Sequence, residues 1–308
     1  KKSISVKIKT ILNLLSFKNL KSSLYNLNHV NSIIAEIKKI KPKKVIFTYE
    51  GYPWERMLNY KIKKFDKSIA TYGYFFSIVS KYHNSPFVRL NKYFDPDYIL
   101  CAGNFAKKTF INKKFRTNNI ITIGHSNLNL DSYKSKKNFD KKNCLILPEG
   151  LNDEVIYLID YAKNILAKNI DINFILRLHP STTREFKEYI KFCIKYSKIK
   201  LSKFTLDEDL KRSKIAIYRG SSAIIGACFA NIIPVYVSKP NELSIDPLFA
   251  ISKAKPKINS ANEFIKFYNQ LNKDQFIYNK KKMDKVQDFC RKYFLDINYH
   301  QLNKLFLS

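Results

Sequence analysis

The sequence predicts an α/β protein with two domains, each built on a parallel sheet that is covered by helices on both faces. Short apolar runs rich in β-branched residues alternate along the chain with longer segments of helical periodicity. This alternation is typical of parallel sheets that are buried on both sides. It is interrupted once, by the polar and charged stretch 126–142, and then restarts. The interruption indicates a linker between two domains.

The first half of the chain shows four apolar, strand-like runs. Apolar residues at helical spacing predict helices within 11–40, the second of which ends before Pro42. A further helix is expected over 54–64, and another from about Asn104. The expected strands are 45–49, 68–72, 98–102 and 120–124.

The second half repeats the pattern after the linker. The expected strands are 144–147, 172–178, 214–218 and 233–237. The expected helices are 153–167, a segment reaching about Tyr196, 221–230, and two more starting at Ala261 and Lys280. We therefore expect an N-terminal Rossmann-like domain over 1–128, a linker over 129–142 and a C-terminal Rossmann-like domain over 143–308, with the sheets facing a central cleft.

The composition is that of a folded globular protein. The chain has 308 residues, of which 45% are apolar and 26% charged. Its five cysteines form no CxxC pair, so neither a zinc site nor a thioredoxin-type motif is indicated, and buried free thiols in a reducing compartment are expected. No apolar run approaches the roughly 18 residues of a membrane-spanning helix.

The start of the chain does not resemble a signal peptide. Lys7 and Lys9 interrupt its apolar run, which favours a cytoplasmic protein, with peripheral contact at the inner membrane left open.

The formal net charge of +31 favours anionic partners: nucleic acid, nucleotide donors or an acidic membrane leaflet. The residue bias of an AT-rich genome explains the same charge. The basic residues are spread along the chain, and no RNA-binding signature or zinc finger is present, so no nucleic-acid partner is expected. GxGxxG, P-loop, HExxH and GxSxG motifs are also absent.

Candidate binding residues follow the strands, because ligands of open α/β sheets bind outside the carboxyl ends of the strands. His179 and Pro180 close one strand of the second half, and the imidazole there can donate to a phosphate oxygen. The next such motif is Arg219-Gly220-Ser221-Ser222, in which Gly220 permits close backbone approach and Ser221 is expected to cap a helix. The free amides of that helix start predict an anion site.

Three acidic residues complete the candidates. Glu50 ends the first strand of the first half, where its carboxylate could deprotonate an acceptor hydroxyl. Glu149, followed by Gly150, ends the first strand of the second half. Glu242 lies in a loop after a later strand, where it could contact a nucleotide ribose.

Glu50-Gly51, His179-Pro180 and Ser221-Ser222 occur in the order of the motifs of bacterial sialyltransferases and polysialyltransferases. The chain resembles these and the Kdo transferases, which are surface-carbohydrate glycosyltransferases of the GT-B type that use CMP-activated sugars. The likeness is best over residues 144–250.

The resemblance implies a metal-independent transfer of sialic acid or Kdo from a CMP donor to a capsule or lipopolysaccharide glycan, or to a lipid-linked glycan. It makes Glu50 the general base. His179 and the serines would bind the donor phosphate. No cofactor and no metal ligand is implied. One carboxylate of the family's acidic pair is replaced by Tyr49, so Glu149 remains an alternative base. A UDP- or GDP-activated donor also stays open, as do three other functions: a CDP-glycerol-type phosphotransferase, a nucleic-acid-binding protein and a non-catalytic assembly protein.

Overall fold

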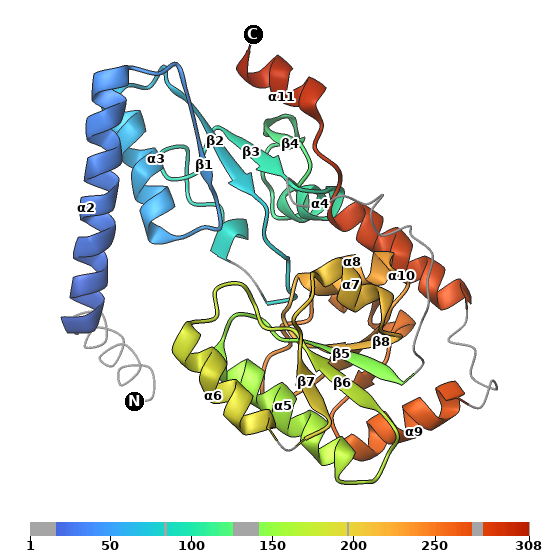
Figure 1. The fold of residues 1–308 in the computed structure, drawn as a ribbon. Coiled ribbons are helices and arrows are strands. Elements are labelled where there is room, and N and C mark those ends of the chain that lie inside the picture. Colours follow the sequence, from blue (N-terminus) through green and yellow to red (C-terminus); the bar gives the residue numbers. More distant parts are fainter. Residues whose placement is uncertain (1–16, 83–84, 126–141, 196, 273–279, 308) are drawn as a thin grey trace, which may run out of the picture.

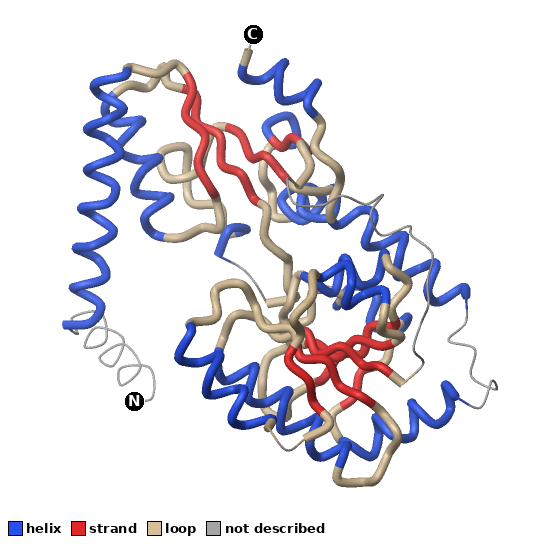
Figure 2. Tube along the Cα trace, in the orientation of Figure 1, coloured by secondary structure: helices blue, strands red, loops and turns tan. Residues whose placement is uncertain are grey.

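The computed structural model describes residues 17–82, 85–125, 142–195, 197–272 and 280–307. It contains two parallel sheets, one of four strands and one of six, each flanked by helices (Figure 1). Figure 2 shows the strands as two separate groups, one in each half of the chain. The α/β class and the two parallel sheets are as the sequence predicts.

The first sheet has the order β1-β2-β3-β4, with every pair parallel. Its strands are β1 (Lys44–Thr48), β2 (Ala70–Phe75), β3 (Tyr98–Cys101) and β4 (Ile120–Thr122). The helical segments of this half are α2 (Phe17–Ile40), α3 (Pro53–Phe65), α4 (Asn104–Asn112) and the short 3₁₀ turns η1 (Ser85–Phe87) and η2 (Thr117–Asn119). Over its described residues, α2 is one continuous helix rather than part of a pair, because residues 17–40 hold no proline or glycine that would break it.

The second sheet has the order β10-β9-β8-β5-β6-β7. Its strands are β5 (Asn143–Leu147), β6 (Asn173–Leu176), β7 (Ile199–Leu201), β8 (Ile215–Tyr218), β9 (Ile233–Val237) and β10 (Lys257–Ile258). Read along the chain, this is the Rossmann order 3-2-1-4-5-6.

The helical segments of the second half connect these strands or follow the last of them. They are α5 (Asn152–Leu166), α6 (Arg184–Ile194), α7 (Leu206–Lys211), α8 (Ala223–Phe229), η4 (Phe249–Ala254) and α9 (Ala261–Asn272). Two further helices, α10 (Lys280–Tyr293) and α11 (Tyr299–Phe306), follow the last strand.

Alternating side chains of the second sheet enter two different cores, because successive residues of a strand point to opposite faces. Cys144 and Ile146 of β5 pack in the core that includes residues of α5, α6 and α9. Leu145 and Leu147 belong to the core that includes residues of α8 and α10. The second core continues into the first half through residues such as Phe110, so the two halves share one apolar interior.

The chain returns to the first sheet at its end. Helix α10 contacts both α8 and α4, and α11 then packs on the first sheet (Figure 1). Leu302, Leu305 and Phe306 of α11 pack against a core formed by Tyr72, Leu100 and Ile123. The amide of Asn298 donates to the carbonyl of Ile123 at 2.9 Å.

Four of the five cysteines, at 101, 144, 228 and 290, are buried free thiols as expected, and Cys193 is partly exposed. No helix in the described parts of the chain has the length and apolarity needed to cross a bilayer. The proposed linker falls almost wholly within 126–141, outside the described residues.

Candidate functional site

The strand order of the second sheet reverses at β5, which pairs with β6 on one side and with β8 on the other. In such sheets the connections leave β5 and β8 toward opposite faces, and the crevice outside their carboxyl ends is where ligands bind. Glu149 and Gly150 follow β5, whereas Gly220 and Ser221 follow β8. In Figure 1 the first sheet's strands point their carboxyl ends toward this half of the protein.

The Glu149 carboxylate lies directly against the backbone of Gly220. A Cβ added to Gly220 would come within 2.3 Å of Glu149 Oε2, so any larger residue at this position would displace the carboxylate. The glycine therefore permits the close approach of Glu149, and its φ lies outside the left-handed region. Burial and the nearby Glu154 carboxylate raise the pKa of Glu149, an effect that Arg219 partly offsets.

His179 lies beside the loop that follows β5. A Cβ on Gly150 would be 3.2 Å from Nδ1 of this imidazole, so the two segments touch. The backbone N–H of Ser181 donates to Nδ1 at 3.2 Å, and the Ser181 hydroxyl lies 2.7 Å from the same atom. Because Nδ1 accepts these bonds, the neutral ring carries its proton on Nε2, which is left as a donor. Pro180 lies in the turn closed by the Thr182 amide and the His179 carbonyl.

Arg219 follows β8 but points into the protein, and its residue is only 1% exposed. Its guanidinium binds Glu154 through Nε, the Val237 carbonyl at 3.0 Å and Glu242 at 2.8 Å. It also lies 5.2 Å from the centroid of the Tyr157 ring. These contacts occupy all three nitrogens of Arg219, so in this conformation the side chain organises the surrounding loops rather than facing the crevice.

Glu242 joins two cations. It pairs with Arg219 and, at 2.5 Å, with Lys239, and the hydrogen bond from Lys239 is the main cause of its lowered pKa. Both side chains remain partly exposed, so this ion pair lies at the protein surface, in the loop that follows β9.

The two serines do not have the expected roles at the helix start. Helix α8 begins at Ala223 with Ser222 as its N-cap, and Ser222 makes no side-chain capping bond. The expectation that Ser221 caps the helix is wrong, because the turn runs one residue further before the helix starts. Ser221 is buried beside Gly220, and Ser222 is exposed.

Glu50 lies in the first half, at the end of β1, and is partly buried. Its backbone N–H donates to Glu55 Oε2 at 2.8 Å, and the amide of Tyr52 donates to the same oxygen at 2.9 Å. The Glu50 carboxylate accepts a hydrogen bond from the Tyr52 hydroxyl. Gly51 has a φ of +77° and touches the Ser85 backbone, so only glycine suits this turn. The fully buried Glu55 thus fixes the loop that carries Glu50.

The second half therefore brings Glu149, Gly150, His179, Gly220 and Ser221 together beyond the carboxyl ends of β5, β6 and β8. Sequence reasoning missed the supporting residues Ser181, Glu154, Tyr157, Lys239 and Glu55. The role of Ser181 could have been predicted from the sequence, because a serine two residues after a turn-forming histidine is placed to form a hydrogen bond with it. The pairing of Arg219 with Glu154 could not, since the two residues are 65 positions apart along the chain.

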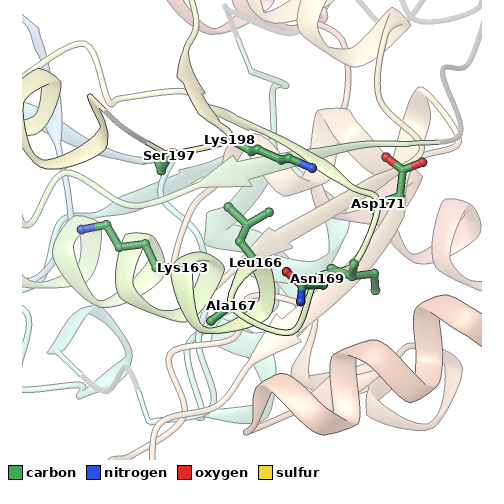
Figure 3. Close-up of a pocket in the computed structure, with 8 residues that line it drawn as sticks. Lys163, Leu166, Ala167, Asn169, Asp171, Ser197 and Lys198 are labelled. Atoms are coloured by element: carbon green, nitrogen blue, oxygen red, sulfur yellow. The ribbon is translucent and has the colours of Figure 1, made fainter.

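A separate cavity of about 510 Å³ lies at the opposite edge of the second sheet (Figure 3). It is bordered by the end of α5 and by residues that precede β6 and β7, including Asp171 and Lys198. The amino ends of parallel strands are not where such sheets bind ligands, so this cavity does not alter the assignment of the site. Within the described residues no group of three or more His, Cys, Asp or Glu side chains could hold a metal ion.

Solved structures that are similar to this chain include glycosyltransferases and UDP-GlcNAc 2-epimerases. The glycotransferase of kitacinnamycin matches 96% of this chain over 84% of its own, with a TM-score of 0.61 and 10% identity. Anabaena HepE in complex with UDP and glucose matches 91% over 81% of its own, with a TM-score of 0.58 and 11% identity. The UDP-GlcNAc 2-epimerase of Methanocaldococcus jannaschii, in complex with UDP-GlcNAc and UDP, matches 86% over 79%, with a TM-score of 0.54 and 17% identity.

The chain has the GT-B fold. This confirms the predicted fold class, which the chain shares with both glycosyltransferases and UDP-GlcNAc 2-epimerases. No protein-family model and no curated protein matches the sequence.

Proposed function

We propose that this chain is a glycosyltransferase that moves a sugar from a nucleotide-activated donor to a hydroxyl acceptor. The observation that carries the proposal is the convergence of Glu149, His179 and Gly220 at the reversal point of the second sheet. An exposed imidazole donor and a half-buried carboxylate that lies against the Gly220 backbone suit a phosphate and a reacting sugar. The GT-B fold supports this assignment.

The donor phosphate binds His179 and the backbone that follows Gly220. His179 Nε2–H donates a hydrogen bond to a phosphate oxygen. The contacts of Ser181 with Nδ1 hold the ring in the tautomer that carries its proton on Nε2. As the glycosidic bond to the phosphate breaks, this donor stabilises the charge that develops on the leaving group. Fixed protein donors of this kind replace a divalent metal, so the reaction is proposed to be metal-independent.

Two carboxylates compete for the role of general base. The sequence favours Glu50, since it comes from the half that would hold the acceptor. The geometry favours Glu149, because it lies at the reversal point, rests against Gly220 and has a raised pKa. We propose Glu149 as the base, with Glu50 contacting the acceptor from the first half.

The donor is proposed to be a CMP-activated acidic sugar, sialic acid or Kdo, and the acceptor a capsule or lipopolysaccharide glycan. The order of the EG, HP and SS motifs supports this choice. The structures of HepE and the archaeal epimerase contain UDP or a UDP-sugar, so a uridine donor is the second candidate. A CDP-glycerol-type transfer is the third.

A nucleotide screen tests the proposal. Thermal unfolding is measured with CMP, CDP, UMP, UDP and GDP in EDTA, for the wild type and His179→Ala. A nucleotide at about 100 times its Kd stabilises the native state by about 2.7 kcal/mol, which raises the Tm by several degrees. Product analysis with the selected donor then separates sugar transfer from epimerisation, hydrolysis and glycerol-phosphate transfer.

Stabilisation by CMP that is lost in His179→Ala supports the CMP-sugar proposal. A response to UDP or CDP instead moves the second or third candidate forward. If no nucleotide shifts the Tm, the phosphate site is wrong, and a non-catalytic or nucleic-acid-binding role takes its place.

A further inference from the structure

The outer edge of the second sheet carries a large basic groove. Strand β7 is an edge strand, and the groove follows it between α6 and the end of α7. Its volume is about 1080 Å³. Of the described residues that line it, five are cationic and none is acidic. The cations are Lys187, Lys191, Lys200, Lys203 and Arg212.

Two of these cations already have acidic partners outside the groove. Lys191 pairs with Glu188 at 2.6 Å, and Arg212 pairs with Asp209 at 2.8 Å. The remaining positive charge comes from long, exposed lysine side chains. Lysines along an edge strand also discourage pairing with another sheet, but that role requires no partner beyond water.

Exposed aromatic side chains accompany this charge. Phe192 is 76% exposed, Tyr189 52% and Phe204 51%. On α6, Phe192 projects from the face opposite Ile190 and Ile194, which are buried. Edge protection does not explain a phenylalanine that projects into solvent beside several lysines.

We propose that α6, β7 and the turn through Phe204, here called the α6–β7 face, dock on an anionic lipid bilayer. The apolar stripe of α6 is buried in the protein core, so contact with a bilayer comes from the exposed aromatic and lysine side chains, which suit an anionic membrane interface. The aromatic rings enter the boundary of headgroups and acyl chains, and the lysine stems lie along it with their charges on lipid phosphates. A soluble polyanion would need the charges but not the projecting Phe192.

The position of this face fits its proposed role. Helix α6 lies on the outer side of the second half (Figure 1). The turn of the face is bonded to the strand that leads to His179: Arg177 Nη1 donates to the Phe204 carbonyl at 2.8 Å, and the Ser202 amide donates to Leu176 at 2.8 Å. Docking would therefore bring the proposed site close to the bilayer, where a lipid-linked acceptor would be found.

The test uses the full chain and sedimentation with vesicles of phosphatidylcholine, either alone or with phosphatidylglycerol. One variant changes Lys187, Lys191, Lys200 and Lys203 to Gln, and a second carries Phe192→Ser and Phe204→Ser. A control changes four exposed lysines of the first half to Gln, and so has the same net charge as the first variant. These are Lys64, Lys67, Lys108 and Lys113.

The wild type is expected to bind only the vesicles that contain phosphatidylglycerol. Each removed lysine should weaken partitioning about fivefold, so the four together weaken it several hundredfold. The aromatic variant should also bind less, and its remaining binding should be more sensitive to salt. The nucleotide response of both variants should equal that of the wild type, which separates this proposal from the proposed function.

Three results would overturn the proposal. One is absence of binding to anionic vesicles. Another is an equal loss in the control variant, which would attribute binding to the overall charge of +31. The last is full displacement by glycerol phosphate at the same phosphate concentration, which would identify a site for a soluble anion.

Discussion

Replacing Gly220 with alanine should separate the position of Glu149 from the stability of the fold. The new Cβ would lie 2.3 Å from Glu149 Oε2, so the carboxylate must move by about 1 Å to reach an ordinary contact of 3.4 Å. The carboxylate ends a flexible side chain, which lowers the cost of moving it, and alanine also reduces the entropy of the unfolded chain by about 0.4–1 kcal/mol. We expect the free energy of unfolding to change by no more than about 1 kcal/mol.

Activity should respond more strongly, because a displacement of about 1 Å in a reacting group costs on the order of 100-fold in rate. The assay measures kcat/KM with the donor chosen by the nucleotide screen, together with urea unfolding followed by circular dichroism. A double-mutant cycle with Glu149→Ala isolates the clash, since Gly220→Ala should have little further effect once the carboxylate is absent. Equal losses in both backgrounds, or unchanged activity in Gly220→Ala, would refute the reasoning.

Three further predictions concern the same site. Arg219→Leu leaves the buried Glu154 carboxylate without its partner and should lower the free energy of unfolding by about 3–5 kcal/mol in urea titrations. A smaller loss in the double variant Arg219→Leu/Glu154→Leu would identify the unpaired charge as the cause. The pKa of Glu149 is higher in the folded than in the unfolded protein, so its stabilising contribution is complete below the unfolded pKa and is lost as the pH rises through the folded pKa. Glu149→Gln should therefore be more stable than the wild type at pH 7, and this advantage should disappear on acidification. Equal urea midpoints at every pH would contradict this prediction. Ser181→Ala removes the hydroxyl beside His179 Nδ1 and should weaken CMP binding, measured by calorimetry, about two- to tenfold. The Tm of the free protein should stay within about 2 °C of the wild-type value. An unchanged Kd for CMP would show that the hydroxyl does not orient the imidazole ring.

The long strands could be predicted because they are buried on both faces. Runs such as Cys144-Leu-Ile-Leu147 and Ile233-Pro-Val-Tyr-Val237 are apolar at every position, which is the pattern of a covered parallel sheet. The predicted site residues followed from the same strands, since the end of a strand is visible in the sequence. Their meeting at one end of the sheet depends on the order of the strands, which the sequence does not display.

Short elements were missed for lack of a repeating pattern. Strand β7 has three residues, one of them a lysine that faces solvent, and β10 has only two. Helix α7 has six residues and an acidic first turn. The apolar residues of α11 are explained by their packing against the first sheet, a contact that the sequence does not reveal. Arg219 illustrates the same limit, because a cation next to a glycine-serine turn suggests a phosphate ligand until its distant carboxylates are known.

The return of α11 to the first sheet has a consequence for how the protein is made. Strands β1 to β4 are translated long before Leu302, Leu305 and Phe306, because almost the whole second half is translated in between. During that interval the apolar patch of Tyr72, Leu100 and Ile123 lacks its cover and can bind a chaperone or another nascent chain. The first sheet is therefore synthesised before the second half but is completed only after it.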